Sequence, residues 1–340
     1  MKRAVAVSTV LILAGLSFLF FFGDNVRRTF AMSADSLAGG DPAQYALSRK
    51  KMLNFGQGNE SYAPVAAGNS HTAWAPNRWT SAKDDRLSTF AIDVDTASYT
   101  LARRTIRDGY LPVKEGVRIE EWVNAFAYQL DAPKDGLPFS VGVEGAPSPF
   151  SPGRTLLKVA LQGRQIRNAD RKPAHLVFLV DTSGSMQGPD RLGLAQESLR
   201  ILTKHLNPRD TVALVTYAGS VREVLPPTSA ESQATILSAI DDLTASGGTA
   251  MGSGLELAFR HAARDVAPGH VARVIVLTDG DANVGNVGAL SMLDGIASYV
   301  KKGVTLTTVG FGMGNYRDST LEQLADKGNG QSLYIDSRDA

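Results

Sequence analysis

Small side chains that carry oxygen gather at three places in this sequence. The first is "DTSGS", which contains Asp181, Ser183 and Ser185. The second is Thr249 in "SGGTAMGSG", and the third is Asp279 in "LTDGDANVG". Together they offer two carboxylates and three hydroxyls without an imidazole or a thiol. That set suits a hard cation, Mg²⁺ first and Mn²⁺ or Ca²⁺ next.

The segments around these clusters predict that the clusters meet at one edge of a sheet. "HLVFLV" (175–180) and "VARVIVLT" (271–278) are apolar runs typical of buried strands. From residue 175 onward such runs alternate with amphipathic stretches of helical spacing. This alternation predicts an α/β fold with a doubly wound, mostly parallel sheet and helices on both faces. Parallel strands place their carboxyl ends together, where ligands bind.

Each cluster also has a purely structural interpretation. "DTSGS" alone suits the N-cap of a helix, where Asp and Ser are preferred, but three clusters in order after strands or before helices favour a metal site. "DVDTAS" (93–98) is similar to the Asp-x-Asp-x-Thr loop of haloacid-dehalogenase-type phosphatases. That loop requires Thr where this chain has Ala97, so helix capping is the prediction there.

At the three clusters the chain resembles the von Willebrand factor type A domain, over about residues 175–340. The metal-ion-dependent adhesion site of that family has the pattern Asp-x-Ser-x-Ser, a distant Thr and a later Asp. The resemblance implies that Ser183 and Ser185 bind the metal directly and that Thr249 binds it directly or through water. It implies that Asp181 and Asp279 often act through water.

Two further points concern the family pattern. Residues 88–126, "STFAIDV…EEWVNAF", also resemble a segment that precedes this domain in exported bacterial proteins. The domain normally ends with a helix after its last strand, whereas this sequence stops at Ala340, soon after "QSLYID" (331–336). We expect that helix, and the further C-terminal domain of the exported relatives, to lie beyond the given sequence.

The composition changes along the chain and predicts four segments. Residues 4–22 are apolar and uncharged, and as a helix they would span about 28 Å, close to a bilayer core. We therefore expect an export signal or uncleaved signal anchor in 1–30. Residues 31–85 are rich in Ala, Gly, Ser, Asn and Pro, which predicts a flexible linker. A small α+β segment over 86–165 precedes the α/β domain over 173–340.

The α+β segment should contain two helices and three strands. A strand is predicted over 88–94 and a helix over 96–109. A second helix over 116–130 would place four apolar side chains on one face, namely Ile119, Trp122, Val123 and Phe126. Two more strands are predicted over 138–146 and 154–164, separated by the turn-rich "PSPFSPG".

The overall composition excludes several kinds of site. The 340 residues carry a formal net charge of +1 and contain no block of basic residues, so nothing indicates nucleic-acid binding. There is no cysteine, which excludes a disulfide scaffold, a zinc-thiolate site and a cysteine nucleophile. Gly-x-Ser-x-Gly and phosphate-binding Walker patterns are absent.

The prediction for function is a metal-dependent adhesion module rather than an enzyme. A cation with neutral hydroxyl ligands keeps much of its charge and would attract a Glu or Asp carboxylate of a partner protein. We expect the folded part outside the cytoplasm, periplasmic and held at the inner membrane by residues 4–22, or secreted if that segment is cleaved. Two alternatives remain: a metal-dependent hydrolase, and a scaffold whose metal only stabilises the fold.

Overall fold

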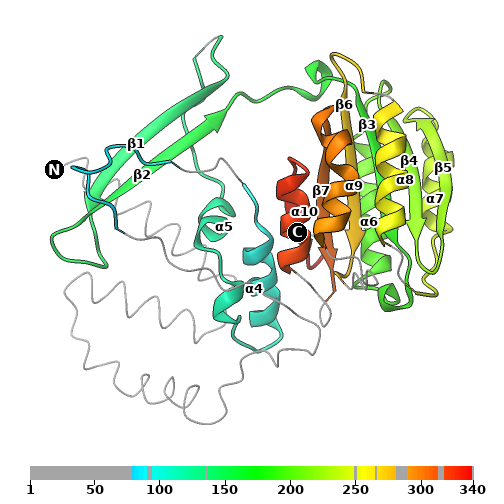
Figure 1. Cartoon of the computed structure of the whole chain (residues 1–340), viewed down its shortest axis with the longest axis horizontal. Helices are drawn as coiled ribbons and strands as arrows, with labels where there is room; N and C mark the ends of the chain where they lie inside the picture. The colour runs from blue at the N-terminus through cyan, green and yellow to red at the C-terminus, as the bar shows by residue number, and fades with distance from the viewer. Residues whose placement is uncertain are drawn as a thin grey trace. The chain divides into compact units, whose positions relative to one another are not determined.

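A computed structural model gives the fold, and Figure 1 shows the whole chain. The predicted signal or anchor, almost all of the linker and residues 90–93 of the first predicted strand lie outside the part that it describes. Within that part, no helix is both long and apolar enough to cross a membrane. The described residues are 79–89, 94–134, 136–248, 251–264, 266–280, 289–312 and 318–338.

The centre of the fold is a six-stranded sheet in the order β5-β4-β3-β6-β7-β8. All neighbouring strands are parallel except β4 and β5, which are antiparallel. The mostly parallel α/β sheet predicted from the alternating pattern is therefore confirmed. The strands are β3 (Ala174–Asp181), β4 (Thr211–Tyr217), β5 (Val221–Ser229), β6 (Val271–Thr278), β7 (Val304–Phe311) and β8 (Ser332–Ile335).

Helices cover both faces of this sheet, as Figure 1 shows. Successive side chains of a strand point to opposite faces, and the central strand β3 divides its side chains in this way. Val177 and Leu179 belong to the cluster that includes residues of α8, α9 and α10, whereas Phe178 and Val180 pack with α6 and α7. The helices are α6 (Leu192–Lys204), α7 (Gln233–Asp241), α8 (Met251–Arg264), α9 (Ala289–Lys301) and α10 (Asp318–Lys327).

The first predicted helix of the α+β segment is confirmed as α4 (Ala97–Arg107). The predicted capping is wrong in detail, because Thr96 occupies the N-cap position but makes no side-chain capping hydrogen bond. The carboxylate of Asp95 instead accepts a hydrogen bond from the backbone N–H of Ser332, with 2.8 Å between N and Oδ1. Asp95 therefore ties the start of α4 to the edge strand β8.

The second predicted helix is much shorter than expected. It is α5 (Ile119–Asn124), and only part of the predicted apolar face is covered. Ile119 and Val123 are 73% and 51% exposed, whereas Trp122 is half-buried and contacts the ring of Tyr99 in α4.

The side of α5 that carries Glu121 faces inward instead. Glu121 is buried, forms an ion pair with Arg118 and accepts a hydrogen bond from the backbone N–H of Ser98 at 2.7 Å. A buried, hydrogen-bonded carboxylate sets the orientation of this helix.

The two later strands of the α+β segment are confirmed as a separate antiparallel hairpin of β1 (Phe139–Pro147) and β2 (Thr155–Gly163). Alternate residues such as Val141, Val143 and Val159 share one face, and their exposed fractions are 55%, 61% and 42%. Short turns of 3₁₀ helix complete the described elements: η2 (Lys114–Gly116), η3 (Asn168–Asp170) and η4 (Gly184–Met186).

Candidate metal centre

The candidate site begins where β3 ends. Asp181 is the last residue of the strand and its exposed fraction is 0%. Its Oδ1 accepts the backbone N–H of Ser183 at 2.9 Å, which turns the chain sharply after the strand. The turn continues into η4 (Gly184–Met186), so the three predicted ligands of "DTSGS" lie around one compact loop.

Two serine hydroxyls of this loop lie together. The Oγ atoms of Ser183 and Ser185 are 3.0 Å apart and share a hydrogen bond. Ser183 is buried, Ser185 is half-buried, and Gly184 between them is exposed. The loop therefore presents its hydroxyl pair next to a point that a partner molecule can reach.

The carboxylate of Asp181 is held by two neighbouring strands. Tyr217 at the end of β4 donates its hydroxyl to Oδ2 at 3.1 Å, and Thr278 at the end of β6 donates to the same oxygen at 2.9 Å. Both residues were missed in the sequence, although each ends a strand that flanks β3. The backbone N–H of Ser183 and the hydroxyls of Tyr217 and Thr278, which bond Asp181, are all neutral donors.

The second carboxylate of the site follows directly after β6. Asp279 is 2% exposed and its neighbour Thr278 is the residue that donates to Asp181. Burial raises the pKa of Asp181; hydrogen bonds from Ser183 and Thr278 oppose this rise, and the negative charge of Asp279 adds to it. Burial and the charge of Asp181 raise the pKa of Tyr217, so its hydroxyl remains a donor. A cation would relieve the repulsion between the two carboxylates.

The remaining predicted ligand, Thr249, lies outside the described residues. The residues just before it are attached to the "DTSGS" loop through two backbone hydrogen bonds. Ser246 donates to the carbonyl of Thr182 at 2.7 Å, and Gly184 donates to the carbonyl of Gly247 at 3.0 Å. Gly247 has a φ of +81°, a conformation that favours glycine.

The structure thus brings Asp181, Ser183, Ser185 and Asp279 to the carboxyl end of the parallel strands, as predicted. In the described ranges no group of three or more His, Cys, Asp or Glu side chains is placed to hold a metal. A site here would consist of two carboxylates and serine hydroxyls, completed by water or by a ligand. This donor set fits a hard divalent cation and does not fit a thiolate-type or imidazole-rich site.

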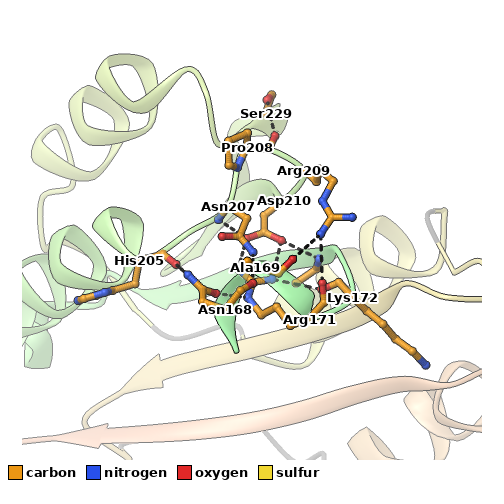
Figure 2. Close-up of polar contacts among 11 residues, drawn as sticks. Asn168, Ala169, Arg171, Lys172, His205, Asn207, Pro208, Arg209, Asp210 and Ser229 are labelled. Carbon is orange, nitrogen blue, oxygen red and sulfur yellow. Dashed lines mark hydrogen bonds and ion pairs between the residues drawn. The ribbon is translucent and has the colours of Figure 1, made fainter. Parts of the chain in front are cut away.

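Another buried aspartate, Asp210, lies at the opposite end of the sheet, just before β4 (Figure 2). The carboxylate of Asp210 accepts the backbone N–H groups of Ala174 at 2.8 Å and Asn207 at 2.7 Å. Both terminal nitrogens of Arg171 also donate to it. Burial alone would raise the pKa of Asp210, but the hydrogen bonds and the charge of Arg171 lower it. This carboxylate already has a cation from the chain itself.

Two family models match the sequence. The model of the von Willebrand factor type A domain matches residues 175–340, which contain the sheet and the candidate metal loop. A second model, described as von Willebrand factor, matches residues 66–158. That match begins within the segment predicted to be a linker and includes α4, α5 and most of the hairpin.

Several known proteins are similar to this chain. The uncharacterized protein YfbK of Escherichia coli (strain K12) is 42% identical over 259 residues, 74% of this chain and 45% of YfbK. The chain spans less than half the length of the first curated relatives that it matches. Among solved structures, BatB from Bacteroides thetaiotaomicron is 20% identical, with a TM-score of 0.42 over 48% of this chain and 91% of BatB. The mussel byssus protein PTMP1, solved with zinc in its metal-ion-dependent adhesion site (MIDAS) motif, is 26% identical, with a TM-score of 0.38 over 50% of this chain and 43% of PTMP1.

Proposed function

This chain is a von Willebrand factor type A domain protein, and on that premise we propose that it binds a partner protein through a divalent cation. The loop after β3 would hold the ion, Mg²⁺ first and Mn²⁺ or Ca²⁺ next. Its ligands would be Asp181, Ser183, Ser185, Thr249 and Asp279. The partner would supply a Glu or Asp carboxylate to the coordination position that the chain leaves open. We assign no catalytic activity to the chain.

The observation that carries this proposal is the environment of the Asp181 carboxylate. It is buried, it accepts hydrogen bonds from three neutral donors, and the charge of Asp279 raises its pKa further. Negative charge in a low-dielectric place is unfavourable unless a cation accompanies it. The accessible part of the loop, at Gly184 and Ser185, is where such an ion would meet both the protein and a partner.

The charge of the proposed ligands indicates what the partner offers. Ser183, Ser185 and Thr249 are neutral, so two aspartates at most offset the charge of a divalent ion. Where the aspartates act through water, the ion keeps more of its charge, and an incoming carboxylate is favoured over a neutral group. Phosphate groups of nucleic acid are not the proposed ligand, because the chain has a net charge of only +1 and no basic block.

The first test is metal binding by calorimetry. Wild-type protein is expected to bind about one Mg²⁺ or Mn²⁺ per chain with all-oxygen ligation. Asp181→Asn and the double variant Ser183→Ala/Asp279→Ala should lose about 10- to 100-fold in affinity. Ser238→Ala, an exposed serine of α7, is the matched control and should bind as wild type. Equal binding by the double variant and wild type would reject the site.

The second test is capture of a partner from an envelope extract of the source organism, with Mg²⁺ or with EDTA. Mg²⁺-dependent capture by wild type and its loss in Asp181→Asn are expected. A hydrolase would instead lose turnover in this variant and keep its partner. If the metal were purely structural, Asp181→Asn would have a lower melting temperature than wild type in Mg²⁺ and would capture the partner as wild type does.

The proposed location is the periplasmic side of the inner membrane, with residues 4–22 as signal and anchor. It is supported by their length and lack of charge. An alkaline phosphatase fusion after residue 35 should be active, because the enzyme folds only after export. An inactive fusion that is made in normal amounts would contradict this topology.

A further inference from the structure

The helix that precedes the metal-binding domain in the sequence is built into the edge of its sheet. Helix α4 contacts β8, and its residues Ala97 and Leu101 are buried in the same cluster as side chains of α8 and α10. Asp95 bonds the backbone of β8, as described above. Arg103 forms a two-pronged ion pair with Asp336, whose side chain is 1% exposed, at 3.1 Å from Nε and 2.5 Å from Nη2.

The next residue of α4 makes a different contact. Arg104 donates from Nη2 to Oδ2 of Asp190 at 2.9 Å. Asp190 does not belong to β8; it lies between the "DTSGS" loop and the start of α6. Arg103 therefore reaches Asp336, the residue after β8, whereas Arg104 reaches Asp190 at the end of the candidate metal loop. Arg104 also interacts with Tyr334 of β8.

The residue after Asp190 contacts the metal loop itself. Arg191 is the N-cap residue of α6, so the start of this helix fixes its backbone. Its Nη1 donates to the carbonyl oxygen of Ser185 at 2.5 Å. Two consecutive residues thus join Arg104 of α4 on one side and Ser185 of the loop on the other.

The side chain of Arg191 is also confined from the opposite side. It lies so close to Gly312, at the end of β7, that a Cβ atom on this glycine would stand 2.6 Å from Cγ and Nε of the arginine. The carbonyl of Gly312 in turn accepts the hydroxyl of Tyr334 from β8 at 2.6 Å. Arg191 therefore has little freedom to leave the Ser185 carbonyl while β7, β8 and α4 keep their places.

We propose that Arg191 and Arg104 are positioning residues for the metal loop: Arg191 holds the Ser185 backbone, and Arg104 holds the 190–191 segment in the place from which Arg191 does so. The inference rests on the proposed metal-binding function. Its physical basis is that residues which orient the ligands of a metal change its affinity without touching the ion. Affinity for the cation then depends on the segment before the domain, through one ion pair of α4.

The test compares Arg191→Gln, Arg104→Gln and the matched control Arg103→Gln in Mg²⁺ and Mn²⁺ calorimetry. Arg191→Gln should weaken metal binding about tenfold or more, as loss of an orienting group does. Arg104→Gln acts one contact further away through a partly exposed ion pair, so a loss of about threefold to fivefold is expected. Arg103→Gln removes an ion pair between the same helix and Asp336, the residue after β8, and should lower the melting temperature without changing the affinity.

Two more variants identify the contact that matters. Asp190→Asn removes only the Asp190 partner of Arg104 and should also weaken metal binding. The double variant should be no weaker than Arg104→Gln alone, because that variant already removes the link to Asp190. Arg104→Lys should recover part of the affinity. Wild-type affinity in Arg191→Gln and Arg104→Gln, or an equal loss in Arg103→Gln, would overturn the inference.

A metal-free measurement separates this inference from the proposed function. In EDTA, hydrogen exchange of the amides of Gly184, Met186 and Gln187, which are hydrogen-bonded in the loop, should be faster in Arg191→Gln and Arg104→Gln than in wild type. Arg103→Gln should exchange as wild type at these amides. If wild type binds no metal, the proposed function is rejected. If exchange at these amides is unchanged in Arg191→Gln and Arg104→Gln, the positioning role is rejected.

Discussion

Two fully buried aspartates stand at opposite ends of the same sheet and have opposite surroundings. Asp210, before β4, accepts hydrogen bonds from two backbone amides and from Arg171, and the net effect lowers its pKa. Asp181, after β3, has neutral donors and the negative Asp279 nearby, and its pKa is raised. Figure 2 shows Asp210 and the donors around it.

The charges around a buried carboxylate indicate whether it stabilises the fold or binds a ligand. Where the chain supplies a cation, as Arg171 does for Asp210, the group stabilises the folded state and needs no ligand. Where the chain supplies a second carboxylate instead, as Asp279 does for Asp181, the two negative charges repel each other, and a bound cation would stabilise the site. The matched change of Asp to Asn at each end separates these two roles.

The largest expected effect is that of Asp210→Asn on stability. Removing one partner of a buried ion pair costs about 3 to 5 kcal/mol, and the partial exposure of Arg171 places the expected loss near 3 kcal/mol. Guanidinium unfolding in EDTA, followed by circular dichroism, measures it. Asp242→Asn, at an exposed aspartate after α7, is the control and should change little. A loss below about 1 kcal/mol at Asp210 would contradict the structural role.

The next effect is the protection that Mg²⁺ gives against unfolding. A ligand at 100 times its dissociation constant stabilises the native state by about 2.7 kcal/mol, which wild type and Asp210→Asn should both gain. At the same Mg²⁺ concentration Asp181→Asn should gain only about 0.4 to 1.4 kcal/mol, because its affinity falls about 10- to 100-fold. Equal protection of the two Asn variants would remove the distinction between the two ends of the sheet.

A smaller effect concerns acid. The folded-state pKa of Asp210 is lowered, so the stability that its charge provides is fully present above the unfolded pKa of about 3.9 and is lost as the pH falls through the folded value. The difference in unfolding free energy between wild type and Asp210→Asn should therefore be constant from pH 6 to about pH 4 and shrink below it. Denaturant titrations in metal-free buffer measure this difference. A difference that stays constant down to pH 3 would argue against the charge as its source.

The smallest effect is that of Asp181→Asn in EDTA. The amide keeps the size of the side chain and an acceptor at Oδ1 for the Ser183 N–H, and it removes the repulsion with Asp279. Its NH₂ group takes the place of Oδ2 and can donate to the hydroxyls of Tyr217 and Thr278, which can act as acceptors. Stability should stay the same or rise by no more than about 1 kcal/mol. Asn is preferred to Ala at this site, because Ala would leave all three donors without a hydrogen-bond partner. A loss of about 2 kcal/mol or more would show that Asp181, like Asp210, stabilises the fold by its charge.

The sequence by itself determined the elements of the sheet and the residues of the candidate site. Strand β6 spans Val271–Thr278, as the apolar run predicted, and the helices follow the spacing of their apolar residues. These features were predictable because a strand buried on both faces and an amphipathic helix leave a local pattern. The convergence of Asp181, Ser183, Ser185 and Asp279 followed from parallel strands alone, while their part in metal binding stays a prediction.

Only the tertiary structure decided which side chains of different strands and helices contact one another. Tyr217 and Thr278 bond Asp181, Arg104 reaches Asp190 86 positions along the chain, and Asp95 bonds a strand 237 positions away. The apolar face expected on α5 formed only in part, because the buried Arg118–Glu121 pair holds one side of the helix while Ile119 and Val123 stay exposed. Such contacts leave no periodic trace in a single sequence, since they arise from strand order, register and the balance of desolvation against hydrogen bonding once the whole chain has packed.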